Sequence, residues 1–502
     1  MKQIMKQSKF FIFLLIVALF QCLAMEAFSF SLEDKVFKTK LKNGITVLIM
    51  ERHISPTVAL YIRHRIGAVD EDEGETGAAH MLEHMMFKGT KTIGTKNYAA
   101  EKKILAAIEK TGAALDIEKQ KGEKANAKII GHLSAQLKKL QDQHKKYVIP
   151  SEIDRIYTQN GGSDLNASTS QDITTYQVSL PANKIEFWAR IESDRLLNPV
   201  FREFYSERDV VMEERRQRTD TNPDGKLYEV FMSTVYSTHP YRNPIIGWPQ
   251  DIIRYSPSMM KKYFEKYRAP HKTVIAVVGA VNTKDTLKLI NKYFGAIPAS
   301  FNKEKEIPAE PKQTEERRVE ITFDSNPMMI IGFHKLNFPA YDDYVFDVLE
   351  TILADGRTSR LYNLLVTQMQ IADSVLVYNG MPASRYPNLF TIFAKPRHPY
   401  TNADLEKEII AQLEKIKAVP VTTEELIRAK NKMRMDFIQR LESNPNLAAT
   451  LSYFEALVGD YRYFSDYLKN IKKVTAQDIQ QAAKTYLNKE NRTIAVLERK
   501  KD

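Results

Sequence analysis

Apolar and polar residues alternate along this chain with two periods, one typical of strands and one typical of helices. Residues 57–66 read TVALYIRHRI, an alternating and β-branched run that predicts a strand. An acidic, glycine-containing loop with the sequence VDEDEGETG follows this run. The next stretch, residues 77–90, reads GAAHMLEHMMFKGT and predicts a helix. The first part of the chain therefore combines strand, loop and helix.

Residues 97–150 predict a helical hairpin in the first half of the chain. The segment is rich in Ala, Lys, Glu and Gln, and it carries apolar or aromatic residues at alternating spacings of three and four, as in a coiled-coil seam. These are Ile130, Leu133, Leu137, Leu140, His144 and Tyr147, with a partner stripe at Ile104, Leu105, Ile108 and Leu115. The polar stretch KQKGEKAN suits the turn between them. We interpret His132 and His144 as solvated helix residues and not as metal ligands.

An internal repeat predicts two homologous halves. The segment from Ile252, IIRYSPSMMKKYFEKYRAPHKTVIAVVG, aligns without gaps with IKKVTAQDIQQAAKTYLNKENRTIAVLE from Ile471. Ser256 and Thr475 take equivalent helix N-cap positions, and each unit ends in a strand of Val, Ile and Ala. We expect an α+β fold of two halves, residues 30–300 and 317–502, joined by a polar linker at 301–316. Each half is expected to hold a mostly antiparallel sheet packed with helices.

The N-terminus, composition and charge narrow the class of protein. Residues 1–29 combine lysines, an apolar run and small residues, which is typical of a secretory signal peptide and too short for a convincing membrane span. The only cysteine, Cys22, raises the alternative of a lipid anchor, although Gln21 fits that signal poorly. A mature chain without cysteine suits an oxidising compartment, and we expect the periplasm of a Gram-negative bacterium. The net charge of +11 comes from basic residues interleaved with acids, and no nucleic-acid partner and no later membrane span are expected.

Within the predicted helix, His80, Glu83 and His84 form the pattern His-x-x-Glu-His, the inverted motif of zinc peptidases. Residues four apart share one helix face, so the two imidazoles can hold one zinc ion. Glu83 lies on the same turn, where it can take a proton from a zinc-bound water. The alternative is a helix whose histidines only satisfy local hydrogen bonds.

A catalytic zinc site needs a third protein ligand, and the best candidate is Glu214. It lies in the helical stretch FYSERDVVMEERRQR, two turns after Glu207 and on the same face. Glu213 points about 100° away from Glu214 and suits a ligand less well. An ordinary solvated Glu/Arg helix surface is the alternative interpretation of this stretch.

The chain resembles the inverzincin peptidases of the pitrilysin, insulin-degrading-enzyme and mitochondrial-processing-peptidase family, and especially its shorter bacterial members. The stretches that carry this resemblance are GAAHMLEHMMFKGT, GGSDLNASTSQDITTYQVSLP, ERDVVMEERRQRTDTNPDGKLYE and HPYRNPIIGW. The resemblance implies that His80, His84 and Glu214 bind one Zn²⁺, that Glu83 is the catalytic base and that Glu207 orients a ligand histidine. It also implies two similar halves that face each other like a clam around a peptide chamber.

The resemblance assigns other roles outside the motif helix. The segment that includes Leu165, Asn166, Ala167 and Ser168 corresponds to an edge strand that pairs with substrate backbone. The second half has no His-x-x-Glu-His motif, so it is expected to contribute shape and substrate contacts. Some family members supply an Arg and a Tyr from this half; Tyr378, Arg385 and Tyr386 are candidates, and a surface loop is the alternative. His239 and His334 are expected to serve packing or hydrogen bonding.

These observations predict a secreted zinc metalloendopeptidase that hydrolyses extended or unfolded peptides. The second hypothesis is a structural or docking subunit of a two-chain processing-peptidase-like complex. A third is a protein that stores or delivers zinc. Family members of this size imply a homodimer, or a heterodimer with a related chain that lacks the zinc motif. The substrate, the cleavage-site preference and the role of the hairpin stay open.

Overall fold

The computed structural model describes residues 35–300 and 305–500. The predicted signal peptide and Cys22 lie outside these residues. The first half is built on a six-stranded sheet, formed by described residues, in the order β1-β2-β6-β3-β5-β4. The strands are β1 (Val36–Lys40), β2 (Thr46–Glu51), β3 (Thr57–His64), β4 (Ser163–Thr169), β5 (Thr174–Pro181) and β6 (Thr273–Gly279). Strand β3 covers most of the alternating run predicted from the sequence, and β4 lies at one edge of the sheet.

The second half repeats this topology with a five-stranded sheet, again formed by described residues, in the order β7-β11-β8-β10-β9. The strands are β7 (Arg317–Phe323), β8 (Met328–Lys335), β9 (Ala372–Met381), β10 (Asn388–Pro396) and β11 (Arg492–Arg499). The pairs β2–β6 and β7–β11 are parallel, and every other strand pairing among the described residues is antiparallel. Apart from β1, each strand of the first sheet therefore has a counterpart in the second.

Helices cover both sheets. Those of the first half are α2 (Ala78–Met86), α3 (Tyr98–Lys119), α4 (Ala127–His144), α5 (Glu152–Gln159), α6 (Ile185–Leu197), α7 (Phe204–Arg215), α8 (Pro223–Val235), α9 (Pro249–Ile252), α10 (Pro257–Tyr267) and α11 (Thr283–Phe294). Those of the second half are α12 (Tyr341–Ala354), α13 (Asn402–Ala418), α14 (Thr423–Gln439), α15 (Asn444–Val458), α16 (Tyr463–Lys473) and α17 (Ala476–Tyr486). The side chains of Ser256 and Thr475 cap α10 and α17, each by accepting a hydrogen bond from a backbone amide in the first turn of its helix, as the repeat predicts.

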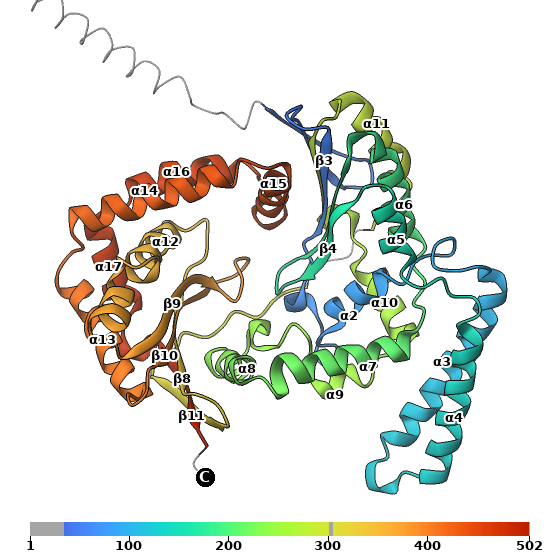
Figure 1. Cartoon of the computed structure of the whole chain (residues 1–502), viewed down its shortest axis with the longest axis horizontal. Coiled ribbons are helices and arrows are strands. Elements are labelled where there is room, and N and C mark those ends of the chain that lie inside the picture. The colour runs from blue at the N-terminus through green and yellow to red at the C-terminus, as the bar shows by residue number, and fades with distance from the viewer. Residues whose placement is uncertain (1–34, 301–304, 501–502) are drawn as a thin grey trace, which may run out of the picture.

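The two halves face each other and exchange one helix each (Figure 1). Helix α15 of the second half packs on β3 and β6 of the first sheet, where Leu447 and Leu451 join a buried apolar cluster. Helix α8 of the first half packs on β7, β8 and β11. A Cβ atom on Gly332 of β8 would lie 2.5 Å from the ring of Phe231 on α8, so this position requires glycine. The exchange buries apolar surface between the halves and holds them together.

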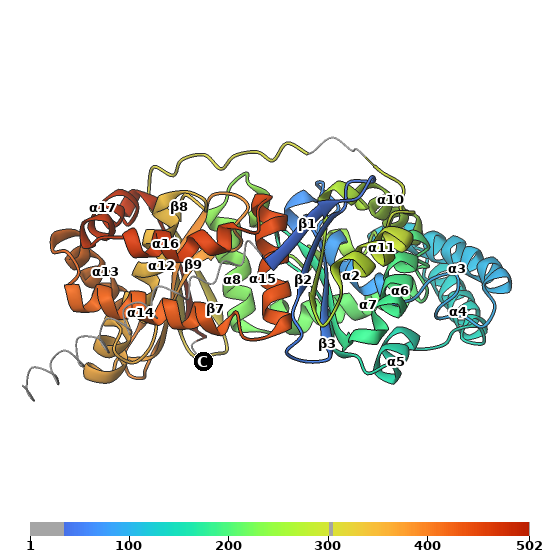
Figure 2. The ribbon, with the colours of Figure 1, turned by 90° about the horizontal axis from the view of Figure 1, so that it is seen from above.

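Residues 305–316, which belong to the predicted linker, contain no helix or strand and run extended across both halves (Figure 2). The Glu310 carboxylate accepts hydrogen bonds from the backbone amides of Ser237, Thr238 and His239 at 2.7–3.0 Å. Burial opposes ionisation, but these bonds lower the pKa of Glu310 to about 2. The segment is therefore anchored midway along its length.

Helices α3 and α4 form the predicted hairpin, which projects from the first half (Figure 1). Asn97 and Asn126 cap the two helices through their side chains. The expectation that His144 is solvated was wrong: it is buried, and its Nε2 lies 2.8 Å from Glu101. Glu101 also accepts two hydrogen bonds from the buried Arg202, so its buried carboxylate has a charged partner as well as His144.

Together these features confirm the α+β fold class predicted from the sequence, with two homologous halves and a helical hairpin in the first. No helix within the described residues is both long enough and apolar enough to cross a membrane.

A half-buried carboxyl group in the second half makes stability depend on pH. Glu350 on α12 accepts a hydrogen bond from the backbone amide of Asn379 at 2.7 Å. Burial raises the pKa of Glu350 from 4.5 to about 8, and the neighbouring Asp347 adds to this shift. The folded chain therefore keeps a proton that the unfolded chain loses near pH 4.5, and stability falls as the pH rises from 4.5 to 8.

We expect Glu350→Gln to raise the free energy of unfolding by about 2 kcal/mol at pH 8.5 and to leave it unchanged at pH 4. The amide removes the cost of ionising a buried group while its oxygen still accepts the Asn379 hydrogen bond. Urea unfolding at both pH values measures the difference, with the exposed Glu424→Gln as the control. An equal effect at both pH values would contradict the prediction.

Candidate metal and catalytic site

At the start of helix α2, the backbone of Gly77 packs closely against the backbone of Ile246. Gly77 has φ +89°, and a Cβ there would lie 2.4 Å from the carbonyl oxygen of Ile246. The backbone amides of Gly77 and Ala79 donate to the buried Glu71 carboxylate, each at 2.8 Å. Met81 and Met85 point into the core. The motif residues lie on the remaining faces of the helix, which are turned toward α7 and β4.

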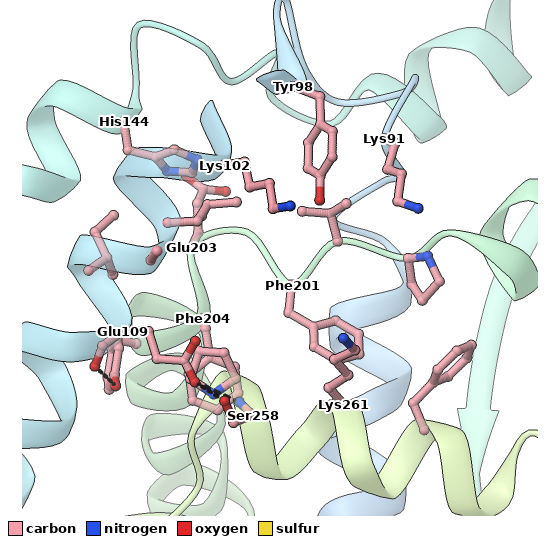
Figure 3. Close-up of a pocket in the computed structure, with 18 of the residues that line it drawn as sticks. Lys91, Tyr98, Lys102, Glu109, His144, Phe201, Glu203, Phe204, Ser258 and Lys261 are labelled. Atoms are coloured by element: carbon pink, nitrogen blue, oxygen red, sulfur yellow. Dashed lines mark hydrogen bonds between the residues drawn. The ribbon is translucent and has the colours of Figure 1, made fainter. Parts of the chain in front are cut away.

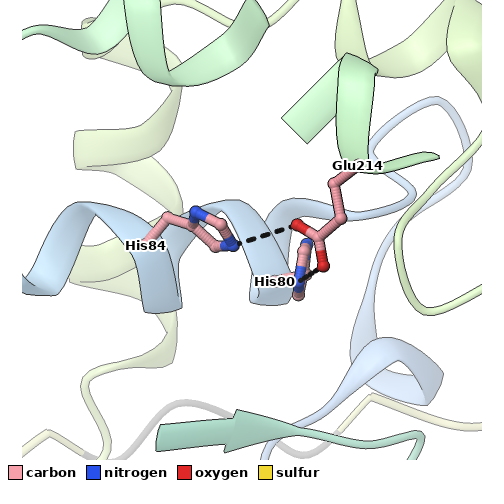
Figure 4. A group of neighbouring side chains, drawn as sticks. All are labelled: His80, His84 and Glu214. Atoms are coloured by element: carbon pink, nitrogen blue, oxygen red, sulfur yellow. Dashed lines mark ion pairs between the residues drawn. The ribbon is translucent and has the colours of Figure 1, made fainter. Parts of the chain in front are cut away.

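The structure brings His80, His84 and Glu214 together, although Glu214 lies 130 residues after His84. His80 Nε2 lies 3.7 Å from Glu214 Oε1, and His84 Nε2 lies 3.4 Å from Glu214 Oε2. Figure 4 shows both imidazoles on α2 facing the carboxylate of α7. One ligand atom from each residue lies within 4.8 Å of the others. Within the described residues, no other group of His, Cys, Asp and Glu meets this criterion.

These distances fit a shared metal ion better than direct hydrogen bonds. Two ligand atoms about 2.0–2.1 Å from a tetrahedral zinc ion lie about 3.3 Å apart. Burial lowers the pKa of His80 to about 4, so its imidazole is neutral, as a metal ligand must be. Its Nδ1 is buried without a hydrogen-bond partner among the described residues. Two imidazoles and one carboxylate are a donor set that suits zinc.

Glu207 orients the second histidine. His84 Nδ1 lies 2.8 Å from Glu207 Oε1, which leaves Nε2 directed at Glu214. Burial favours the neutral imidazole, but the bond to Glu207 and the contact with Glu214 raise the pKa of His84 to about 9, so a metal ion would have to displace a proton from this imidazole. Lys88 donates to the other oxygen of Glu207 at 2.6 Å. Arg218 contacts Glu214 Oε1, the oxygen that faces His80, at 2.9 Å.

Glu83 lies between α2 and the edge strand β4. Thr169 at the end of β4 donates its hydroxyl to Glu83 Oε2 at 2.5 Å. Burial raises the pKa of Glu83 above its usual value, and the Thr169 bond partly opposes this rise. A carboxylate with a raised pKa beside a metal site suits a group that takes and returns a proton.

Strand β4 has one free edge. It pairs with β5 alone among the described strands. Asn166 and Ser168 are exposed, whereas Leu165 and Ala167 are half-buried. The backbone amide of Ala167 donates to the side chain of Asn166 at 2.9 Å. The Asn166 side chain therefore accepts the hydrogen bond that the Ala167 amide could otherwise donate to an added strand.

A cavity of about 350 Å³ adjoins Glu83 and His84. Lys88 and Glu207 line one wall, and residues 148–154, where the chain leaves the hairpin, line another. The hairpin insertion therefore contributes to the surroundings of the motif.

The second-half candidates serve other contacts in this structure. Arg385 donates to both oxygens of the buried Asp70 at 3.1 and 2.9 Å. Asp172 accepts hydrogen bonds from the backbone amides of Ser384 and Arg385, each at 2.8 Å. These bonds tie a loop of the second half to the first half.

The aromatic candidates and the remaining histidines occupy distinct surroundings. The ring centroid of Tyr386 lies 5.1 Å from that of His239, whereas Tyr378 is exposed. His239 Nδ1 accepts a hydrogen bond from the Tyr241 amide, and His334 bonds the Val235 carbonyl. Both histidines therefore serve packing and hydrogen bonding.

Several residues around the motif were missed in the sequence. Lys88 follows His84 by four residues, so helical spacing would have placed it beside the motif. Thr169 lies within the predicted edge-strand segment, residues 165–170, but was given no role; the alternation of a strand would have placed it on the face of Ala167. Arg218 follows Glu214 by four residues, so helical spacing would have placed it beside that carboxylate. Glu71 carries no such signal, because its contacts depend on the path of the chain.

Comparison with known proteins decides the family. The family model described as "Insulinase (Peptidase family M16)" matches residues 46–127 and 139–248. The model described as "Peptidase M16 inactive domain" matches residues 254–433. The chain belongs to the M16 peptidase family. The first match covers the His-x-x-Glu-His motif and Glu214, and the second agrees with a second half that has no such motif.

Relatives of this M16 chain are named as zinc proteases. It is 28% identical over 467 residues to "Zinc protease PqqE" of Helicobacter pylori, covering 91% of each chain. An uncharacterized zinc protease of Rickettsia felis is 24% identical, covering 88% of this chain and 92% of the relative. Family and relatives together support a protease-like function.

Solved structures agree on the fold of the M16 chain. The crystal structure of a protease from Helicobacter pylori has a TM-score of 0.76 and 27% identity, covering 92% of this chain and 99% of that chain. The periplasmic protease PqqL from Escherichia coli has a TM-score of 0.69 and 16% identity, covering 92% of this chain and 47% of that chain. The latter likeness concerns the fold alone.

Proposed function

We propose that this chain is a zinc-dependent metalloendopeptidase that hydrolyses extended or unfolded peptides. The observation that carries the proposal is the convergence of His80, His84 and Glu214, with Glu83 on the same helix and the free edge of β4 beside it. A ligand set that leaves a coordination position open is typical of catalytic zinc sites, whereas structural sites are closed.

His80, His84 and Glu214 would hold one Zn²⁺. The ion, when bound, polarises the scissile carbonyl and lowers the pKa of a bound water. Glu83 takes the proton of the attacking water and returns it to the leaving amine. Thr169 holds the Glu83 carboxylate in place through its hydroxyl, and Glu207 keeps His84 in the tautomer whose Nε2 faces the site.

Leu165, Asn166, Ala167 and Ser168 would bind substrate by β-augmentation, in which an extended peptide adds a strand at a sheet edge. The Ala167 amide would exchange its bond to Asn166 for one to a substrate carbonyl. Main-chain hydrogen bonds depend little on sequence. The edge of β4 would therefore fix the register of the bound peptide, whereas side-chain pockets would set the preference for particular residues. The cavity of about 350 Å³ beside Glu83 is large enough to receive a substrate side chain.

We also propose that the protein acts in the periplasm after removal of residues 1–29, in keeping with the name of its structural neighbour PqqL. Its partner would be a second copy or a related chain lacking the zinc motif. The match of residues 254–433 to an inactive domain favours a second candidate function, a docking subunit of a two-chain complex.

Hydrolysis of a mixed quenched-fluorescent peptide library by the purified chain separates these functions. We expect turnover that stops when a chelator removes the metal and returns when zinc is added. No turnover by a chain that holds one zinc, and restoration by a related partner chain, would instead indicate the two-chain complex. No turnover in either case would overturn the proposed activity.

We expect Glu207→Gln to weaken zinc binding by about 10–100-fold, because the amide supports the His84 imidazole less well than the carboxylate. Competition with a chromophoric chelator measures the zinc affinity. Glu203→Gln is the matched control, since Glu203 belongs to the same turn and lies 3.6 Å from Lys88 without contacting His84. Equal zinc affinity in both variants would contradict the role of Glu207.

A further inference from the structure

A second cavity lies at the base of the hairpin and is not used by the proposed chemistry. Its volume is about 410 Å³, within the range of small-molecule sites. It is walled by α3, the end of α4, the loop before α7, and α10 (Figure 3). The hairpin therefore creates this cavity, just as it shapes the cavity beside Glu83.

The floor of this cavity is aromatic. Phe201 and Phe264 meet edge to face with ring centroids 6.4 Å apart, and Phe204 and Tyr205 do so at 5.5 Å. Phe204, Tyr205 and Phe264 are buried. Aromatic walls with a small number of polar groups are the usual surroundings of a bound organic molecule.

Two polar side chains that line the mouth of the cavity, the half-buried Tyr98 and the solvent-exposed Lys102, have no protein partner in the described part of the chain. Tyr98 and Lys102 are four residues apart on α3, so they share one face. Figure 3 shows the Tyr98 hydroxyl and the Lys102 ammonium directed toward the centre, with Lys261 of α10 reaching up from the other side. No hydrogen bond or ion pair joins Tyr98 or Lys102 to another residue in the described part of the chain. Within the same described part, the exposed Lys261 contacts Glu265 alone, at 4.0 Å.

The charge of the lining favours an anion. Five basic and three acidic side chains line the cavity. Glu109 is held by the backbone amide and hydroxyl of Ser258. Glu203 lies 3.6 Å from Lys88, which is not part of the lining, and Glu265 lies 4.0 Å from Lys261. Lys102 and Lys261 are thus the cations most available to a ligand. A carboxylate between them can accept from both ammonium groups and from the Tyr98 hydroxyl.

We propose that this cavity binds an amphiphilic carboxylate, a fatty acid whose chain lies on the aromatic floor and whose head group contacts Tyr98, Lys102 and Lys261. The same ligand touches the hairpin and the first turn of α7, the helix that carries Glu207 and Glu214. Binding therefore stabilises the hairpin against the body of the first half.

Isothermal titration of the full chain with dodecanoate below its micelle concentration tests the proposal. We expect saturable binding of one dodecanoate per chain, weakened at least about tenfold in the double variant Lys102→Glu/Lys261→Glu, because each charge-assisted hydrogen bond contributes that much. The matched control is Lys103→Glu/Lys262→Glu, which changes the net charge equally at adjacent exposed positions that do not line the cavity. The control pair is expected to bind as the natural chain does.

Two further measurements test dodecanoate binding without reversing the charge of a lysine. Ala106→Trp places a large side chain in the cavity and is expected to abolish binding, while circular dichroism and the thermal midpoint confirm folding. Dodecanol, which lacks the carboxylate, is expected to bind at least about tenfold more weakly. The proposal is overturned if dodecanoate does not saturate, if the control pair binds as weakly as the lining pair, or if dodecanol binds equally well.

Discussion

Glu83→Gln is expected to lower the turnover of peptide substrate by about three orders of magnitude while the chain keeps its zinc. Glutamine has nearly the same shape, and its amide cannot take a proton from water; general acid–base groups contribute about 10²–10⁴-fold. The Thr169 hydroxyl can still donate to the remaining carbonyl oxygen, so the site keeps its arrangement. Hydrolysis of the quenched peptides and zinc content by mass spectrometry are measured on the same sample.

The control for this variant is Glu73→Gln, in the exposed part of the loop that leads to α2. It removes one carboxylate near the motif without touching the site and should retain full turnover. If Glu83→Gln hydrolyses peptides as fast as the natural chain, Glu83 is not the base. If Glu83→Gln has also lost its zinc, the loss of turnover comes from the missing metal, and the expectation that the variant keeps its site is wrong.

Glu214→Ala is expected to release zinc and abolish hydrolysis together. The carboxylate bridges the two imidazoles, with oxygens 3.7 Å from His80 and 3.4 Å from His84. Glu207 of the same helix is already bonded to His84 Nδ1. Loss of a direct ligand should weaken zinc binding by more than the about 10–100-fold caused by losing a supporting partner. Zinc retained per chain after dialysis against a weak chelator gives the affinity.

Glu213→Ala is the matched control, because Glu213 is the preceding residue and bonds the exposed Arg216 at 2.7 Å. It should retain zinc and activity. Zinc loss in Glu213→Ala with retention in Glu214→Ala would reverse the ligand assignment. Equal loss in both would indicate that α7 as a whole had been disturbed.

Features that depend on residues close together in the sequence can be predicted from the sequence alone. The spacing of His80 and His84 places both on one face of any helix, and the repeat around Ser256 and Thr475 encodes two equivalent caps because a cap depends on the next three residues. Strand β3 and the paired stripes of the hairpin follow from periodicity. The preference for Glu214 over Glu213 also needs only helix geometry and the resemblance to known peptidases.

Contacts between distant segments depend on how the elements pack. The Thr169–Glu83 bond requires β4 to end beside α2, and the burial of His144 requires Glu101 and Arg202 to meet it at the base of the hairpin. The sequence does not reveal that α8 and α15 pack on the opposite halves, because an amphipathic helix has the same pattern of apolar residues whichever sheet it covers. The cavity at the hairpin base likewise exists only where four separate segments meet. Side-chain spacing is a local property of the chain, whereas burial and shared contacts are properties of the packed fold.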